Sequence, residues 1–254
     1  MPTETVEYTD FASIVSPGDG AGGQPAWVPA AFPDPGGGLW TYQEPNAVVV
    51  IQDGRLRVAA APFTRGHDEV QILDNAKHMY FSTRTFEAPE GGRLRAEWEM
   101  SARTMDARPG DLYDAFVSFH LLDMTTGTAL DVFACNEVVA TVYARLPFPG
   151  APVPRPASGP RYFSVFDELR DRTVAGELHR YAMTYDRAAG SVVYEMDGEE
   201  IGRYGDVLPI GPCLLAMGLM TEKDIDPGGK GSTSCHGQGA IGSWGDIRIT
   251  LESS

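Results

Sequence analysis

The sequence predicts an all-β protein, and three observations lead to this prediction. Apolar and polar side chains alternate at Tyr181–Tyr185 and again at Val192–Met196. Turn residues separate these runs at Asp186–Gly190, and a second tight turn follows at Asp197-Gly198. Alternation with period two, broken by such turns, is typical of an antiparallel β-meander. The 29 glycines and 19 prolines suit a chain of strands and turns.

The length and charge of the chain limit its organisation and its partners. A chain of 254 residues fits one all-β domain spanning 1–254, and no internal repeat is visible. The net charge of −15 argues against nucleic acid, whose phosphates require Lys and Arg, and against anionic membrane surfaces. We therefore expect a small-molecule substrate as the partner. The oligomeric state stays open.

The sequence also gives an expectation for the cellular compartment. The chain begins MPTETVEYTDF, without a charged-then-apolar leader, and no apolar run approaches the ~18 residues of a membrane span. Cys135, Cys213 and Cys235 are odd in number, lie far apart and have no metal-ligand spacing. We expect a cytoplasmic protein with free thiols and no bound metal. No nucleotide or flavin motif is visible, so we expect no cofactor.

In the N-terminal part we expect strands at Val6–Ala12, Glu69–Asp74 and Tyr80–Phe86 and a hairpin at Val48–Ala60. Gly, Pro and Ala dominate residues 16–38, which predicts a long surface loop anchored by Trp27 and Phe32. Trp40 and Tyr42 lead from that loop into the hairpin.

The middle of the chain is expected to supply the central strands. Apolar and charged side chains alternate along Arg93–Ala102, so one face packs between two sheets and the other meets water or a cleft. Three further strands are predicted at Ala115–Asp123, Ala129–Asn136 and Val138–Leu146. Residues 146–160 contain six prolines in fifteen residues, so they form a loop at the cleft and not a strand. A short helical turn is expected within Tyr162–Arg172.

Four segments share the strand-and-turn pattern of a known family. His179 leads a strand that is followed by a strand ending in Met196-Asp197-Gly198, and Asn46–Pro62 has a strand–Asp-Gly–strand pattern. Together with Gly211–Thr221 and Ile241–Leu251, these segments resemble the concanavalin A-like lectin/glucanase superfamily, including the family 16 glycoside hydrolases. The resemblance implies a jelly-roll β-sandwich of two antiparallel sheets, in which the outer face of one bent sheet forms a concave cleft.

The same resemblance argues against glycoside hydrolysis. Family 16 enzymes carry E-x-D-x-(x)-E on a central cleft strand, where the two glutamates act as nucleophile and acid/base. The matching segment here is residues 129–135, ALDVFAC, in which only the central acid, Asp131, remains. Ala129 replaces the first glutamate, and Phe133 or Ala134 replaces the second. A retaining mechanism needs both carboxylates, so we expect none here.

Period-two alternation predicts which side chains face the cleft. If Val117, Phe119 and Leu121 point into the core, the cleft side chains of that strand are Phe116, Ser118 and His120, and the next strands contribute Asp131, Phe133 and Cys135, then Thr141, Tyr143 and Arg145. A carboxylate beside His120 can orient the imidazole and raise its pKa, which makes His120 and Asp131 an acid/base pair. Tyr143 can donate a hydrogen bond to an oxyanion or carbonyl. The alternative is a structural histidine hydrogen-bonded inside a sandwich.

An apolar, deformable lining completes the expected site, and the predicted substrate-binding residues are Phe116, Ser118, Phe133, Trp40, Met217 and Met220. Cys135 is expected to be a buried inert thiol, not a nucleophile. Glu222, Asp224 and Asp226 fit a solvated acidic loop better than a calcium site. Glu97 and Glu99, near Arg93 and Arg95, fit a salt-bridged exposed face.

Three functions compete at this point. In the first, a cofactor-independent intracellular enzyme of the cyclase, isomerase or lyase type acts on a small, largely apolar substrate by holding it in a reactive shape. The second is a carbohydrate-active protein, either a hydrolase or lyase with rearranged residues or a lectin-like binder. The third is a non-catalytic interaction module. The apolar cleft set and the missing glutamates favour the first.

Overall fold

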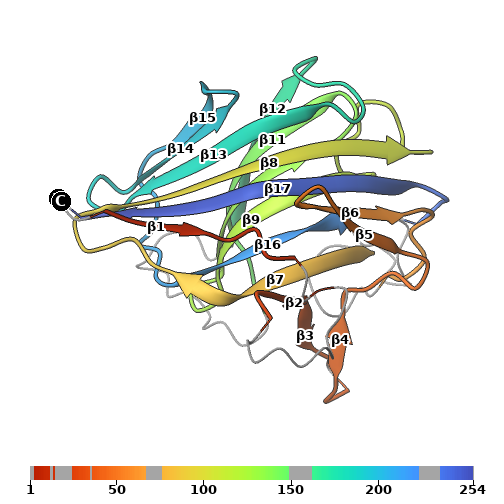
Figure 1. The fold of residues 1–254 in the computed structure, drawn as a ribbon, viewed down its shortest axis with the longest axis horizontal. Helices are drawn as coiled ribbons and strands as arrows, with labels where there is room; N and C mark the ends of the chain where they lie inside the picture. Colours follow the sequence, from red (N-terminus) through yellow and green to blue (C-terminus); the bar gives the residue numbers. More distant parts are fainter. Residues whose placement is uncertain are drawn as a thin grey trace.

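The computed structural model describes residues 3–11, 14, 25–34, 36–66, 76–148, 162–222 and 235–253. Two antiparallel sheets lie one on the other, and a small hairpin projects beside them (Figure 1). This arrangement is a jelly-roll β-sandwich, as the sequence predicts. Within the described part of the chain, no helix combines the length and hydropathy that crossing a lipid bilayer requires.

The first sheet has eight strands in the order β15-β14-β13-β8-β17-β6-β5, with β1 also paired to β17. Its strands are β1 (Thr3–Glu7), β5 (Val48–Gln52), β6 (Arg55–Ala60), β8 (Arg93–Met105), β13 (Leu178–Asp186), β14 (Ser191–Met196), β15 (Glu199–Tyr204) and β17 (Gly239–Glu252). Side chains on β8 alternate between buried and more exposed along its whole length. The predicted alternation on the strand at Arg93–Ala102 is therefore confirmed.

The second sheet has seven strands in the order β12-β11-β10-β9-β16-β7-β2. Its strands are β2 (Trp27–Pro29), β7 (Lys77–Phe86), β9 (Phe116–Asp123), β10 (Thr128–Ala134), β11 (Val138–Arg145), β12 (Phe163–Arg170) and β16 (Cys213–Met220). The remaining strands, β3 (Ala31–Pro33) and β4 (Leu39–Thr41), form the hairpin that lies below β7 in the view of Figure 1. Strands β9, β10 and β16 are almost wholly buried on both faces.

The main hydrophobic core lies between the two sheets. Trp98 on β8 stacks on Phe119 of β9, with ring centroids 4.2 Å apart, so the stack joins one sheet to the other. Gly242 on β17 lies opposite this second sheet, where an added Cβ would come within 2.8 Å of Val117 and 2.9 Å of Leu219. The two sheets are therefore in direct contact around β9, β16 and β17.

A second apolar cluster covers the outer face of the seven-stranded sheet. It includes Met79 and Phe81 from β7, Phe133 from β10 and Met220 from β16, together with Phe32 from the β3–β4 hairpin. A sheet that is apolar on both faces must be covered on both. The hairpin supplies part of this cover and turns the outer face into a partly enclosed site.

Several expected elements differ from the structure. Residues 163–170 form strand β12, not a helical turn, because the segment pairs along its whole length with β11. The loop predicted at 16–38 contains strands β2 and β3, although its anchors Trp27 and Phe32 are buried as expected. The first strand ends at Glu7, earlier than expected. The predicted strand Glu69–Asp74 and residues 149–160 of the proline-rich loop lie outside the described residues.

Candidate functional site

A cavity of about 710 Å³ lies on the outer face of the seven-stranded sheet. Strands β7, β9, β10, β11, β12 and β16 form its floor, and Phe32 and residues 146–148 contribute to its sides. Most of the lining is apolar, with phenylalanine prominent: Phe32, Phe81, Phe133, Phe148, Phe163 and Phe166. The volume and the apolar character are typical of a small-molecule site.

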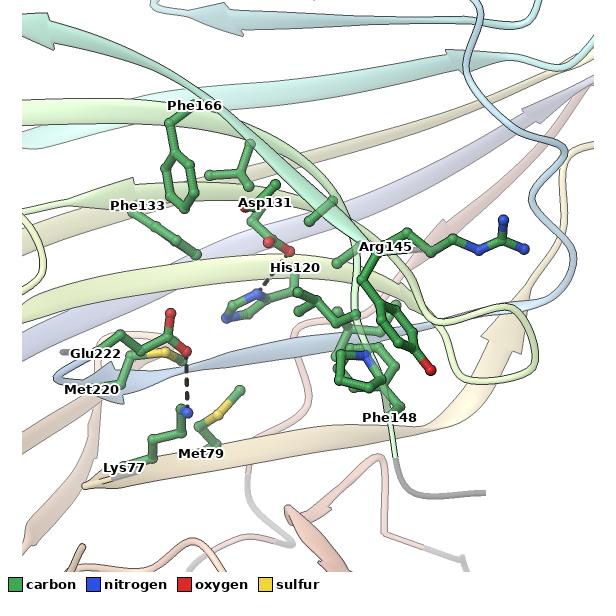
Figure 2. A pocket seen from close by; sticks show the side chains of 18 of the residues that line it. Lys77, Met79, His120, Asp131, Phe133, Arg145, Phe148, Phe166, Met220 and Glu222 are labelled. Carbon is green, nitrogen blue, oxygen red and sulfur yellow. Dashed lines mark hydrogen bonds and ion pairs between the residues drawn. The ribbon is translucent and has the colours of Figure 1, made fainter. Parts of the chain in front are cut away.

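His120 and Asp131 form a hydrogen-bonded couple on the floor of this cavity (Figure 2). They are directly paired in the β9–β10 register, so the neighbouring strands place both side chains on the same face. His120 Nδ1 lies 2.8 Å from Asp131 Oδ1, and both side chains are almost fully buried. The predicted contact between the two side chains is therefore present, and their acid/base role stays a prediction.

Burial raises the pKa of Asp131, and the negative charge of Glu222 adds to this effect. The charge of His120 and its hydrogen bond to Asp131 oppose the rise without cancelling it. Asp131 therefore holds a proton more readily than an exposed carboxyl group does. A carboxyl of this kind beside an imidazole can take part in proton transfer.

Two predicted binding residues, Phe116 and Ser118, lie on the expected face of β9 but beneath the cavity surface. Ser118 Oγ is 2.7 Å from His120 Nε2, so it supports the imidazole from below. Phe116 is completely buried and packs on Phe133, with ring centroids 4.4 Å apart. Phe133 and Met220 line the cavity itself, as predicted.

The prediction that Tyr143 faces the cleft is wrong. Tyr143 pairs with Leu130 in the β10–β11 register, and both belong to the core between the sheets. Its hydroxyl oxygen accepts a hydrogen bond from the backbone N–H of Leu208 at 2.8 Å. The side chains of β11 that line the cavity are Val142 and Ala144, together with Arg145 at the end of the strand.

Met217 and Trp40 also lie away from the cavity. Met217 is completely buried in the core between the sheets, because its neighbours on β16 take the outward positions. Trp40 on β4 is partly buried under the guanidinium of Arg65, which lies 4.2 Å from the ring centroid. Neither side chain contributes to the cavity lining.

The structure adds one couple that the sequence did not reveal. Lys77 Nζ lies 3.1 Å from Glu222 Oε1, and both residues line the cavity (Figure 2). Lys77 begins β7 and pairs with Met220 of β16, and Glu222 follows two residues later. A strand pairing known in advance would have indicated this contact. The expectation of a solvated acidic loop is corrected for Glu222, while Asp224 and Asp226 lie outside the described residues.

Strand β10 contributes one carboxylate, Asp131, to the cavity, as the missing glutamates predict. Ala129, Asp131 and Phe133 of the segment that resembles the family 16 motif all line the cavity and contribute one carboxylate. Ala134, the other candidate for the second glutamate position, belongs to the core between the sheets. Asp131 and Glu222 are the two carboxylates of the described lining, and each is already engaged by a basic side chain. In the described part of the chain, no cluster of three or more His, Cys, Asp or Glu could hold a metal ion.

The sequence matches one protein family over most of its length. A family model described as a family of unknown function, DUF6081, matches residues 24–253. The chain belongs to this family. No curated protein matches the sequence of this DUF6081 member.

Solved structures share the fold of this DUF6081 protein. A β-1,3-1,4-glucanase (lichenase) from a mouse hindgut metagenome is 14% identical, with a TM-score of 0.54 and coverage of 99% of both chains. A Bacillus licheniformis β-glucanase is also 14% identical, with a TM-score of 0.54 and coverage of 100% of this chain and 99% of the other. The Crh5 transglycosylase is 14% identical at a TM-score of 0.52, covering 100% and 85%. The structural similarity shows that the fold is concanavalin A-like. At identities this low it says nothing about activity, which must be argued from the residues of the site.

The cysteines and the two glutamates on β8 lie outside the cavity lining. Cys135 and Cys213 are buried, and burial raises the pKa of each thiol, which suits inert side chains. Cys235 is exposed, and all three are free thiols. Glu97 and Glu99 pair with Arg95 and Arg55, which confirms a salt-bridged face on β8.

Proposed function

We propose that this protein binds a small, largely apolar molecule in the cavity and rearranges it by acid–base chemistry. The observation that carries the proposal is the placement of the His120–Asp131 and Lys77–Glu222 couples in a cavity lined mainly by Phe, Met and other apolar side chains. Cyclisation, isomerisation and elimination need a substrate held in a reactive shape and a group that moves a proton.

The apolar walls support a lipophilic ligand. Each sugar hydroxyl removed from water must find a hydrogen-bonding partner, because an unsatisfied polar group costs free energy. Phe133, Phe166 and Met79 offer no such partners along most of the cavity surface. They favour a ligand whose carbon skeleton fills the space and whose few polar atoms meet the two couples.

A second candidate is a carbohydrate-active protein, and the structural neighbours favour it. Proteins with the same fold include two glucanases and a transglycosylase, and these activities fit this reading better than the first. In this candidate Asp131 and Glu222 are the carboxylates that would act on the sugar. Ala129, and Phe133 or Ala134, at the positions that match the family glutamates in the resemblance, weigh against it.

Ligand binding measured by thermal shift distinguishes the two candidates. The probes are a panel of lipophilic small molecules and a panel of β-linked gluco-oligosaccharides. The proposal expects the melting temperature to rise with lipophilic probes and to stay constant with oligosaccharides. Binding and cleavage of the oligosaccharides, lost in Glu222→Gln, would establish the second candidate instead.

Two variants on β12 place the bound probe. Phe166 lies over the cavity beside Phe133, whereas Leu169 on the same strand packs against the core between the sheets. Phe166→Ala is expected to weaken binding by about tenfold or more, because the ligand loses its apolar contact with one aromatic ring. Leu169→Ala, the matched control, is expected to leave affinity unchanged. Equal affinity in both variants would place the ligand elsewhere.

A further inference from the structure

The hydrogen bonds around His120 allow its protons to be assigned. Ser118 Oγ lies 3.2 Å from the backbone oxygen of Gly218 and 2.7 Å from His120 Nε2. A carbonyl oxygen can only accept a hydrogen bond, and a serine hydroxyl has a single hydrogen to donate. When Ser118 gives that hydrogen to Gly218, its oxygen must accept one from Nε2. In that arrangement His120 carries a proton on Nε2.

The proton on the other side of the ring follows from the same reasoning. With Nε2 protonated, the 2.8 Å contact between Nδ1 and Asp131 Oδ1 requires one shared proton. This proton lies on Nδ1 in an ion pair and on Oδ1 in a neutral pair. In both forms Oδ2 of Asp131 has no proton and acts as an acceptor. Among the described residues, no hydrogen bond engages this oxygen.

We propose that Ser118 is a positioning residue that keeps the Nε2 proton on His120, so that Asp131 Oδ2 is the atom that accepts a proton from the substrate. This proposal deepens the proposed function and rests on it. The substrate class it selects is an apolar molecule with one acidic O–H, N–H or C–H bond. His120 acts through Asp131 and does not itself take the substrate's proton.

The proton transfer balances within the couple. Asp131 Oδ2 takes the proton from the substrate. In the neutral pair the shared proton moves from Oδ1 to Nδ1 in the same step, and in the ion pair it is already on Nδ1. The electron pair of the broken bond stays on the substrate, and in both cases the step ends with His120 as an imidazolium whose Nε2–H is held by Ser118. The couple gains one proton and one positive charge in this step. Lys77, in the same cavity, supplies a positive charge for the developing anion.

The charged and titratable groups around His120 come from several elements. Asp131 reaches it from β10, and Glu222 and Lys77 line the same cavity from the ends of β16 and β7. The Phe133 ring packs against the imidazole at 5.6 Å between centroids. Burial of Asp131, at 3% exposed, keeps bulk water from competing for the shared proton.

Nitrogen NMR of the ¹⁵N-histidine-labelled protein tests the proposal without any substrate. Long-range proton–nitrogen correlation reports which ring nitrogen of each histidine carries a hydrogen, and His120→Gln assigns the His120 signals. In the wild type at neutral pH, Nε2 is expected to show the signature of a protonated nitrogen. An unprotonated Nε2 would overturn the proposal, because Ser118 would then be the donor to the ring.

Two variants of Ser118 provide the second readout. Ser118→Ala is expected to release the Nε2 proton to solvent and to leave the one shared proton on Nδ1, donated to Asp131, and Ser118→Thr is expected to restore the wild-type pattern. Unchanged His120 signals in Ser118→Ala would also overturn the positioning role. The wild-type spectrum decides the question if the alanine variant does not fold. A failed ligand screen leaves this result intact, so the two proposals fail separately.

Discussion

Lys77 Nζ and Glu222 Oε1 lie 3.1 Å apart inside a cavity whose other walls are mainly apolar. Lys77 is 2% exposed, so its ammonium group depends on protein partners in place of water. Taking a charge out of water is costly, and a nearby opposite charge offsets the cost only while both partners remain. The stability of the protein at the ends of β7 and β16 therefore depends on both charges being present.

Breaking this pair from one side should destabilise the fold. We expect Lys77→Met to lower the free energy of unfolding by about 3–5 kcal/mol, because Glu222 is left without its cation in an apolar site. The double variant Lys77→Met/Glu222→Leu should recover much of the loss. A double-mutant cycle measured by urea unfolding checks this. Additive single effects would show that the two charges do not depend on each other.

His78 should make stability fall in mild acid. Its Nδ1 accepts a hydrogen bond from the N–H of Glu44 at 3.1 Å, and Nε2 lies 2.9 Å from the Tyr80 hydroxyl. Burial lowers the pKa of His78 from 6.5 to about 4. The unfolded chain therefore binds the proton first as pH falls, and stability is lost between pH 6.5 and about 4.

The size of this effect can be measured by urea unfolding at neutral pH and near pH 4. The wild type should lose about 3 kcal/mol through His78 over this range. His78→Gln should flatten this part of the pH profile. Tyr80→Phe, which changes the partner and keeps the titrating ring, should retain the slope. A profile that is equally steep in His78→Gln would refute the assignment.

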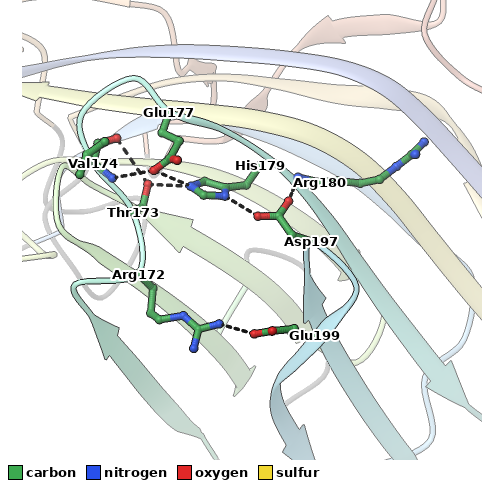
Figure 3. A network of polar contacts seen from close by, with 8 residues as sticks. All are labelled: Arg172, Thr173, Val174, Glu177, His179, Arg180, Asp197 and Glu199. Carbon is green, nitrogen blue, oxygen red and sulfur yellow. Dashed lines mark hydrogen bonds and ion pairs between the residues drawn. The ribbon is translucent and has the colours of Figure 1, made fainter.

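Asp197 should stabilise the β13–β14 hairpin above acidic pH. Burial raises its pKa, but the hydrogen bonds from His179, at 2.7 Å, and from the Arg180 N–H, at 2.9 Å, outweigh this and leave the pKa lowered (Figure 3). A lowered acid pKa means that the stabilisation is present above the unfolded pKa of 3.8 and is lost as pH falls through the folded value.

Asp197→Asn is the informative change, because Asn tolerates the φ of 53° at this turn. We expect the wild type to be more stable than this variant at neutral pH and the difference to vanish in strong acid. Thermal melts across pH measure this. Glu199→Gln, which removes an exposed partner of Arg172, serves as the control with little effect. A difference that persists in strong acid would contradict the prediction.

A side chain at Gly242, where the two sheets are in contact, should destabilise the fold. An added Cβ would lie 2.4 Å from the Trp244 ring and within 3 Å of Val117 and Leu219. We expect Gly242→Ala to lower the free energy of unfolding by about 1–3 kcal/mol through overpacking. Gly205→Ala, where an added Cβ meets nothing within 4 Å, is the matched control. Equal urea midpoints for the two variants would refute the close approach.

Strand alternation predicts the cavity-facing side chains correctly on β9 and incorrectly on β11 and at Met217 of β16. The strand holding His120 was oriented correctly, because its neighbours Val117 and Phe119 belong to the core between the sheets. Tyr143 was placed on the wrong face. Strand β11 is buried on both faces, so its apolar sequence contains no polar side to fix its orientation. Met217 on β16 was misplaced for the same reason.

The sequence by itself determined the all-β class, the positions of most strands and the absence of the glutamates that flank Asp131, because alternation and turn residues are local properties of the chain. Only the tertiary structure decided that Lys77 meets Glu222 and that Ser118 supports His120 from beneath. Such contacts depend on which strands pair, in what register and with which face outward, and these are set by packing over the whole sheet.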